Sequence, residues 1–400
     1  MRAGYFFKVL IVVFILVLAL FIYYRVNFQK NNAPLGGRNS IILSGEQIFP
    51  NGLTIEKNQT LIIKPGTHIK IGKDARINIK GRIIAIGNQK EPIVFSGLNG
   101  YWRGIRIEGD IFNTDSIKNY YKKSLLNRSI NLSKILSSLK NGSIFINCHF
   151  ENLATEFKRR DVRNRTKGVI EAFNTYLIVA HSNFDKDIFQ IGGILTQNSL
   201  ALIAHNHFGS KMIMKSIYGK NSVLIVKNNL IVPKRYEFQT WPDGVFSENS
   251  FSLIFGNTFE GTADDGINCV SSFCFAADNI VNSPFDDGID IDGNSEAILV
   301  NNRIYDTYDE GIVVSDGSEA WLLDDRIYNI KTKHVSNALP INTSNGALTL
   351  REGAKVYAKR LVIKNSQRGI YLKQEIPLVF SNSNFETVEK FISNLSEEQI

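Results

Sequence analysis

An acidic residue followed by glycine and an aliphatic residue recurs four times in the second half of the chain. The acids of this acid–glycine repeat lie 22, 22 and 23 residues apart, and they are Asp243, Asp265, Asp287 and Glu310. Carboxyl groups serve as general acids and bases, as nucleophiles and as ligands for Ca²⁺. A constant period brings such residues together if each repeat is one turn of a stacked structure.

A second ladder has the same period. Its members are Asn257, Asn279, Asn302 and Asp325, and the coils before it pass through Ser182, Asn206 and Asn228. Two features with one period of about 22 residues indicate a solenoid. Helical repeats need roughly 33 to 47 residues. Short alternating strands separated by Gly, Asn and Asp instead predict an all-β fold, a single-stranded right-handed parallel β-helix. We expect the asparagines to form an internal amide ladder.

The β-helix prediction fixes how the acids are arranged. Equivalent residues on successive coils lie about 4.8 Å apart, the spacing of neighbouring strands. In Ile289-Asp290-Ile291-Asp292 the isoleucines should face the interior and the aspartates the outer surface. Like charges at this spacing repel by about 3 kcal/mol at an effective dielectric constant near 20. We expect shifted pKa values, a bound cation or basic neighbours to relieve this repulsion. The alternative is that Asp-Gly is only a favoured turn pair.

The composition narrows the class of protein. A net charge of +8 and a pI near 9.2 are modest for 400 residues and would suit an anionic polymer. No zinc-finger spacing or aromatic RNA-binding motif is present, so we expect no nucleic acid partner. Cys148, Cys269 and Cys274 have the spacing of neither a disulfide framework nor a metal site, and Cys269 fits a core strand position. A solenoid needs no division into globular domains, and we expect a monomer.

The N-terminal segment differs from the rest of the chain. Residues 9–24 are apolar apart from tyrosine hydroxyls, and basic residues flank them. We interpret them as a single transmembrane signal anchor, with residues 1–8 in the cytoplasm and residues 25–40 as a tether. A cleaved signal peptide is the alternative. The β-helix, predicted over residues 41–383, would then lie on the extracytoplasmic side, in a periplasm or at a cell surface.

Insertions are expected to interrupt the coils at about residues 112–142, 154–167, 232–242 and 335–346. The first has apolar residues at helical spacing and predicts a helix on the flank of the solenoid. The third precedes the acid repeat and carries basic and aromatic side chains suited to sugar rings, although a lid over the bore is the alternative. Our predicted substrate-binding residues are Arg235, Tyr236, Phe238, Trp241 and Asp243. Residues 384–400 predict a helical cap on the open end.

The first predicted coils resemble a known superfamily. The segment from Leu53 to Gly109, with Leu-Ile-Ile-Lys-Pro-Gly and Tyr-Trp-Arg-Gly-Ile-Arg-Ile-Glu-Gly within it, looks like the opening coils of right-handed β-helix proteins of the pectin-lyase-like superfamily. The coil pattern extends over most of the remaining chain. This resemblance implies the fold but not the activity, because the superfamily includes lyases, hydrolases, epimerases and inert surface proteins.

Acid pairs on adjacent coils are similar to the active-site strip of polygalacturonase-type glycoside hydrolases. That family has an Asp on one coil and Asp-Asp on the next, and Asp265 with Asp286-Asp287 matches those positions. It then has His-Gly, where this chain has Glu310-Gly311, and Arg-x-Lys, where this chain has Lys331-Thr-Lys333-His334. The candidate catalytic residues are therefore Asp265, Asp286, Asp287, Glu310, Lys333 and His334.

Two other functions fit the same residues. A cation-assisted lyase or C5-epimerase acting on a uronan would hold Ca²⁺, the candidate cofactor, with Asp287, Asp290 and Glu310. Lys333 or His334 would then remove the C5 proton. A scaffold or adhesion protein of an envelope or polysaccharide assembly would use the acid–glycine repeat only as turns. The sequence thus predicts a membrane-anchored protein that binds or processes an acidic polysaccharide, and it leaves open whether the protein is an enzyme.

Overall fold

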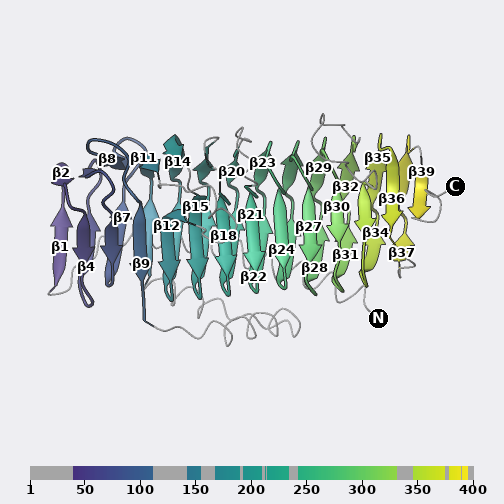
Figure 1. Cartoon of the computed structure of the whole chain (residues 1–400), viewed down its shortest axis with the longest axis horizontal. Coiled ribbons are helices and arrows are strands. Elements are labelled where there is room, and N and C mark those ends of the chain that lie inside the picture. The colour runs from purple at the N-terminus through teal and green to yellow at the C-terminus, as the bar shows by residue number, and fades with distance from the viewer. Residues whose placement is uncertain are drawn as a thin grey trace.

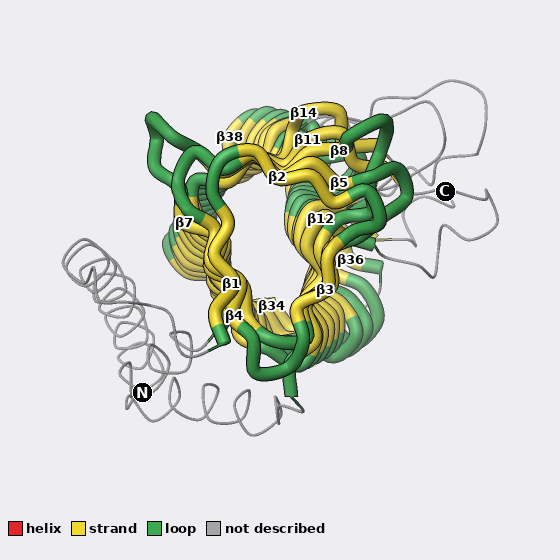
Figure 2. The backbone as a smooth tube through the Cα atoms, turned by 90° about the vertical axis from the view of Figure 1, so that its left-hand side faces the viewer, coloured by secondary structure: helices red, strands yellow, loops and turns green. Residues whose placement is uncertain are grey.

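The computed structural model describes residues 39–110, 142–154, 167–189, 192–209, 212, 214–233, 242–330, 346–373, 378–388 and 390–394. In these ranges the chain forms strands and no helix (Figure 1). The strands build three parallel sheets of 13 strands, and each coil adds one strand to every sheet. Figure 2 looks along the axis and shows the three sheets as three walls around one interior. The described chain is therefore a parallel β-helix.

The strands take their places in strict rotation. Sheet A contains β1 (Ser40–Leu43), β4 (Thr60–Ile63), β7 (Arg82–Ile86), β10 (Ser143–Ile146), β13 (Tyr176–Ala180), β16 (Leu200–Ala204), β19 (Val223–Lys227), β22 (Phe251–Phe255), β25 (Phe273–Ala277), β28 (Glu296–Val300), β31 (Glu319–Leu323), β34 (Lys355–Lys359) and β37 (Leu378–Ser381). Sheet B contains β2 (Glu46–Phe49), β5 (His68–Ile71), β8 (Ile93–Gly97), β11 (Cys148–Ala154), β14 (Asn183–Phe189), β17 (His207–Phe208), β20 (Leu230–Ile231), β23 (Thr258–Glu260), β26 (Ile280–Asn282), β29 (Arg303–Tyr305), β32 (Arg326–Tyr328), β35 (Val362–Lys364) and β38 (Asn384–Glu386). Sheet C contains β3 (Leu53–Ile55), β6 (Ile77–Ile79), β9 (Ile105–Glu108), β12 (Gly168–Phe173), β15 (Gly192–Gln197), β18 (Ile217–Lys220), β21 (Val245–Glu248), β24 (Ile267–Val270), β27 (Ile289–Asp292), β30 (Ile312–Val314), β33 (Leu348–Leu350), β36 (Arg368–Leu372) and β39 (Lys390–Asn394).

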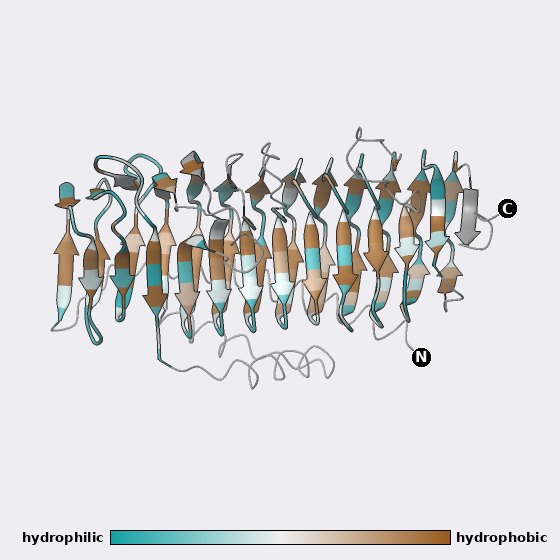
Figure 3. Ribbon diagram, in the orientation of Figure 1, coloured by the Kyte–Doolittle hydropathy of each residue, from teal (hydrophilic) through white to brown (hydrophobic). Residues whose placement is uncertain are grey.

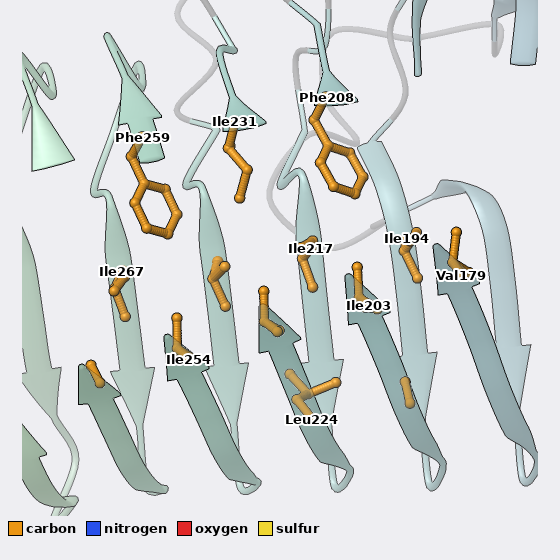
Figure 4. Close-up of a cluster of buried hydrophobic side chains, with 14 of the residues drawn as sticks. Val179, Ile194, Ile203, Phe208, Ile217, Leu224, Ile231, Ile254, Phe259 and Ile267 are labelled. Carbon is orange, nitrogen blue, oxygen red and sulfur yellow. The ribbon is translucent and has the colours of Figure 1, made fainter. Parts of the chain in front are cut away.

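The interior is filled by one aliphatic or aromatic side chain after another along the axis. Figure 4 shows Ile254 of sheet A, Phe259 of sheet B and Ile267 of sheet C pointing toward one another, and all three are fully buried. Apolar segments recur in every coil (Figure 3). Burying each such side chain contributes about 1.5–3 kcal/mol, so stacking coils is what stabilises short strands that could not persist alone.

The alternation predicted for sheet C is confirmed. Cys269 pairs with Ile291, which pairs with Val314, and all three are buried. Asp290 and Asp292 lie between the inward positions and are partly exposed on the outer face. Cys269 is thus a small core residue, as expected.

From β13 onward, the corner between sheets A and B takes two residues in every coil. In the coil of β25 and β26 it consists of Asp278, whose φ is +54°, and Asn279. Asn257 Nδ2 donates to Asn279 Oδ1 at 3.0 Å, and Asn279 Nδ2 donates to Asn302 Oδ1 at 2.9 Å. The predicted internal amide ladder is confirmed, and it ends on the buried carboxyl of Asp325.

One ladder position was predicted wrongly. The residue that donates to Asn257 Oδ1 is Asn229, with an Nδ2–Oδ1 distance of 2.9 Å, and not Asn228. Asn228 takes the preceding corner position, with φ +51°. The coil that leads to Asn257 is longer than 22 residues, so the period does not decide between Asn228 and Asn229.

The predicted C-terminal helix is also wrong where this part of the chain is described, because Asn384–Glu386 forms β38 and Lys390–Asn394 forms β39. Phe385 pairs with Ile363 and packs against the core, and β39 extends sheet C beyond β36. A parallel edge that offers free backbone groups and an apolar end favours a further strand over a helix. The predicted flanking helix within residues 112–142 and the predicted anchor, residues 9–24, lie outside the described residues. Within the described part, no helix is long and apolar enough to cross a membrane.

The corner between sheets B and C varies in length. It takes six residues in three successive coils, namely residues 261–266, 283–288 and 306–311. The connections on either side are longer, at residues 232–244 and 329–347. These three tight turns carry most of the acids of the repeat.

Candidate functional site

The three tight turns place carboxyl groups in two rows along the axis. The inner row consists of the acids that precede glycine, Asp243, Asp265, Asp287 and Glu310, which are between 1% and 7% exposed. The outer row consists of the acids one residue earlier, Asp264, Asp286 and Asp309, which are partly exposed. Backbone bonds such as Gly244 N–H to Asp265 O and Gly266 N–H to Asp287 O hold successive turns in register.

Two of the inner-row side chains, those of Asp265 and Asp287, also bond to the backbone. Asp287 N–H donates to Asp265 Oδ1 at 3.0 Å, and Glu310 N–H donates to Asp287 Oδ1 at 2.9 Å. Each carboxylate therefore satisfies a buried amide of the next coil, and this contact favours its ionised form. Asp265 and Asp287 thus have a structural task in addition to any chemical one.

A cation stands at each end of the inner row. Lys215 occupies the equivalent position one coil before Asp243 and forms an ion pair with it. Arg351 Nη2 contacts Glu310 Oε1 at 2.5 Å. Partial burial disfavours the Arg351 cation, but the attraction of Glu310, Asp287 and Asp290 outweighs it and raises the pKa of Arg351.

The middle of the cluster lacks such partners and retains protons. Burial, with the nearby charges of Asp243 and Asp265, raises the pKa of Asp264 to about 10. Burial, with the charges of Glu310 and Asp286, raises the pKa of Asp309 to about 8. Burial is also the first cause for Asp290, whose pKa is raised to about 7. At neutral pH these acids therefore keep protons that an isolated aspartate would have lost.

The buried acids between them follow the same direction. Burial raises the pKa of Asp286 above its ordinary value, and that of Asp265 and Asp287 well above it. For Asp287 the next cause is the charge of Glu310. The cluster thus titrates as a unit rather than as independent groups.

Neutral side chains complete the surroundings of the acids. Asn268 Nδ2 donates to Asp265 Oδ2 at 2.7 Å and to Asp290 Oδ2 at 3.5 Å, so it links the inner row to the face of sheet C. Phe285 and Tyr308, which directly precede two outer-row acids, stack with ring centroids 4.6 Å apart. An aromatic pair beside carboxyl groups is typical of sites that bind amphipathic ligands.

The donor set fits a hard cation such as Ca²⁺. Two groups have carboxylate oxygens within 4.8 Å of one another, Asp243 with Asp264 and Asp265, and Asp286 with Asp287 and Asp309. Asp243 Oδ1, Asp290 Oδ1 and Asp309 Oδ1 are buried and accept no hydrogen bond from the described residues. Ca²⁺ takes carboxylate oxygens in flexible geometry, so these residues would hold it and neutralise the rows.

The predicted Ca²⁺ ligands are arranged differently from these groups. One oxygen of Asp287 accepts the Glu310 amide, and Glu310 is paired with Arg351. Asp290 faces the rows from sheet C and shares Asn268 with Asp265. The predicted set Asp287, Asp290 and Glu310 stays a prediction, and of these three only Asp290 has a buried oxygen without a hydrogen-bond partner among the described residues.

The other predicted site residues divide into two groups. Asp243, Asp265, Asp286, Asp287 and Glu310 lie together in the two rows. The remainder lie outside the described residues, namely Arg235, Tyr236, Phe238, Trp241, Lys333 and His334.

Sequence reasoning missed Lys215, Arg351, Phe285 and Tyr308. Lys215 could have been found as the residue equivalent to Asp243 in the preceding coil. Arg351 directly follows the alternating strand Leu348–Leu350. The longer connections before Asp243 and after Glu310 change the step and conceal both positions.

Comparison with known proteins bears on the fold. Residues 243–396 match the family model described as the right-handed β-helix region. The fold over these residues is a right-handed parallel β-helix. The matched part of the β-helix begins at Asp243 and contains the three tight turns.

Solved structures similar to this β-helix share little sequence with it. The A-module of the mannuronan C-5 epimerase AlgE4 from Azotobacter vinelandii is 11% identical, with 90% of this chain and 89% of that chain covered and a TM-score of 0.44. The catalytic domain of a GH87 α-1,3-glucanase is 13% identical, with 92% and 68% covered and a TM-score of 0.45. The periplasmic alginate epimerase AlgG is 12% identical, with 89% and 85% covered and a TM-score of 0.31. The search of curated proteins found no match.

Proposed function

We propose that this protein binds a polysaccharide across the two acid rows and processes it by general acid–base chemistry. The observation that carries the proposal is the mixture of carboxyl groups in one small cluster. Asp243 and Glu310 are paired with cations, whereas the pKa values of Asp264 and Asp309 are raised to about 10 and about 8. A protonated acid beside an ionised one is the arrangement that protonates a leaving group while a base acts elsewhere.

Hydrolysis of a glycosidic bond is the reaction that this arrangement supports best. A protonated outer-row acid would donate to the leaving oxygen, and an ionised acid would act as nucleophile or activate water. Acids on adjacent coils are about 4.8 Å apart and those two coils apart about 9.6 Å. The first separation suits retention of configuration and the second suits inversion. A lyase or a C5-epimerase would use the same ionised acids as the base for proton removal.

The test compares the full-length protein with Asp286→Asn/Asp309→Asn on a panel of neutral and uronate-containing polysaccharides. New reducing ends would indicate hydrolysis, absorbance of an unsaturated uronate a lyase, and C5 proton exchange without cleavage an epimerase. We expect the double substitution to reduce turnover by about 10²–10⁴-fold, the usual contribution of a general acid or base. Equal turnover in both proteins would sink the proposal.

A matched control exists in the same coils. Asp278→Asn/Asp306→Asn removes the same charge at corner positions whose φ values are +54° for both residues. Asparagine tolerates this conformation, and neither residue belongs to the acid rows. The control should retain wild-type turnover.

A scaffold that binds a polysaccharide without processing it is the second candidate. It is supported by the backbone hydrogen bonds that Asp265 and Asp287 accept, because these bonds hold adjacent coils together and require no catalysis. Binding without turnover by any of the three assays would favour this candidate.

We further propose that residues 9–24 anchor the protein in a membrane and that the β-helix lies on the extracytoplasmic side as a monomer. The apolar run and its basic flanks support this. The full-length protein should sediment with membranes, and the β-helix should be accessible to protease from the extracytoplasmic side. A mature N-terminus beyond residue 19 would show that the segment is cleaved instead.

A further inference from the structure

A second surface of interest lies on the outer face of sheet B. Arg303 of β29 pairs in register with Arg326 of β32, and both side chains are exposed. Two positions further along the same strands, Tyr305 pairs with Tyr328. One coil before Arg303, Ile280 is 37% exposed. We name Arg303, Arg326, Tyr305 and Tyr328 the Arg–Tyr face.

The two arginines have no anionic partner within the described part of the chain. Neither forms an ion pair or a side-chain hydrogen bond there, although basic residues nearby do. Arg360 contacts Asp324 at 2.5 Å, and Lys364 contacts Glu386 at 2.7 Å. Stacking two guanidinium groups at the spacing of neighbouring strands brings like charges together without relief. An anionic ligand would supply the negative charge that the neighbouring coils do not place opposite these arginines.

The tyrosines present hydroxyl groups rather than ring faces. Their rings stack with centroids 5.2 Å apart and an angle of 14° between the planes. By register, the outer ring faces are turned toward Asn282 on one side and Lys364 on the other. Neither hydroxyl has a hydrogen-bond partner among the described residues. The face therefore offers hydroxyl donors in a row, and it lacks the open stacking platforms that single-stranded nucleic acids require.

The position of the face connects it to the candidate site. Tyr305 is followed by one tight turn, and Asp309 of the outer row is the fourth residue after it. At no more than about 3.3–3.6 Å per residue, the two lie within the length of a short oligosaccharide. The Arg–Tyr face and the acid rows are thus adjacent surfaces of the same coils with opposite charge.

We propose that the Arg–Tyr face binds a carboxylate-bearing polysaccharide and holds it next to the acid rows. This inference rests on the proposed polysaccharide partner and narrows it to a uronate-containing polymer. A guanidinium group matches a carboxylate with two parallel hydrogen bonds. The repeat of the face, one coil or about 4.8 Å, is comparable to the length of one sugar residue. The tyrosine hydroxyls would bond to the sugar oxygens, and Ile280 would contact the apolar ring surface.

Binding of polygalacturonate to the full-length protein in detergent tests the inference. We expect Arg303→Gln/Arg326→Gln to weaken binding by at least about tenfold, since two charge-assisted contacts are lost, and to reduce its salt dependence. Tyr305→Phe/Tyr328→Phe keeps the stacked rings and should weaken binding less. Lys64→Gln/Lys90→Gln removes the same charge on distant coils, where both lysines are exposed, and should bind as the wild type does.

Several outcomes would overturn the inference. Wild-type affinity of the double arginine variant would do so, as would equal binding of amylose, which carries no carboxylate, or tighter binding of oligo(dT). The proposed function is tested separately by Asp286→Asn/Asp309→Asn. If no polysaccharide is turned over but polygalacturonate binding still depends on the arginines, the proposed chemistry fails and this inference stands. If turnover is found and the arginine substitutions change neither binding nor KM, the reverse holds.

Discussion

The corner between sheets A and B and the corner between sheets B and C use the same kind of contact, with different side chains and in opposite directions along the axis. At the first, Asn279 Oδ1 accepts the backbone N–H of Asn257 at 3.0 Å. At the second, Asp265 Oδ1 accepts the backbone N–H of Asp287 at 3.0 Å. Both contacts join adjacent coils, and both involve buried side chains. The two ladders differ in what happens to the rest of the side chain.

An amide can accept and donate, so the asparagine ladder satisfies its own groups and carries no charge. An ionised carboxylate only accepts, so the acid rows accumulate charge with each coil. Lys215 and Arg351 relieve it at the two ends, and raised pKa values relieve it between them. A repeated side chain whose hydrogen bonds are complete is sufficiently explained by structure. A repeated side chain that leaves charge uncompensated points to a ligand or a reaction.

Breaking the amide ladder should have the largest effect on stability. Asn279→Leu would leave the Asn257 side-chain amide, the Ile254 carbonyl and the backbone N–H of Asn257 without their partner. We expect a loss of about 3–4 kcal/mol in the free energy of unfolding, because each unsatisfied buried group costs about 1–3 kcal/mol. Denaturant unfolding followed by circular dichroism measures this. A loss below about 1 kcal/mol would show that the ladder is dispensable.

Removing the cation at the end of the acid row should have the next largest effect. Arg351→Gln leaves the buried Glu310 carboxylate unpaired. We expect a loss of about 2–3 kcal/mol at pH 8, less than for a fully buried pair because Arg351 is partly exposed. The loss should shrink at pH 5, where more of the cluster is protonated. Arg360→Gln, which breaks an exposed pair with Asp324, is the control and should cost less than about 1 kcal/mol.

The acid rows should also give the protein an unusual dependence on pH. The pKa values of Asp290 and Asp309 are raised to about 7 and about 8, above the unfolded value of about 3.9. Between these limits the folded chain binds more protons than the unfolded chain, so stability is greatest near pH 4 and falls as pH rises through 8. Because both carboxyl groups are partly exposed and solvent screens their interactions, we expect a fall on the order of 1–2 kcal/mol rather than the roughly 1.4 kcal/mol per pKa unit of unscreened groups. The fall should be smaller in Asp286→Asn/Asp309→Asn. Urea unfolding across this range checks it, and rising stability would contradict the assigned protonation.

Ca²⁺ should produce the smallest effect. Filling one acid group at about ten times its dissociation constant stabilises by about 1.4 kcal/mol, which raises Tm by about 1–3 °C. Asp286→Asn/Asp309→Asn removes ligands from one group and should gain less. Differential scanning fluorimetry with Ca²⁺ and with a chelator measures both proteins. Equal gains in both proteins would show that the group of Asp286, Asp287 and Asp309 holds no cation, and no gain in either protein would show that neither group does.

The fold could be predicted because its rules are local and repeat. Ile289-Asp290-Ile291-Asp292 alternates as a half-buried strand must, and the constant step of the repeat by itself places Asn257, Asn279 and Asn302 on one line. Prediction failed where the number of residues between equivalent positions on successive coils changed. Asn229 was mistaken for its neighbour, and β38 and β39 were predicted as a helix because a chain end has no following repeat to reveal its register.

The candidate site could be predicted only in part. Spacing alone brings Asp265, Asp287 and Glu310 together, since each precedes a glycine. It does not reveal that Asp287 bonds to the Glu310 amide, or that Arg351 reaches back to Glu310 across a longer connection. Which carboxyl group keeps its proton depends on burial and on several neighbours at once, and a sequence pattern contains neither.

The two-residue corner between sheets A and B bears on how such a chain can change in length. Every coil from β22 to β32 turns there through one residue with positive φ and one ladder residue, so a break at this corner always separates equivalent positions. Residues 279–301 form a cassette that could be duplicated with its ladder asparagine, its strands and the acid pair Asp286-Asp287. Each added copy would lengthen the acid rows by one coil, and the connection between copies would be the same two-residue corner that already joins the coils. The number of acids in the rows therefore depends on how many such coils the gene encodes, and duplication of one coil can change it without altering the rest of the protein.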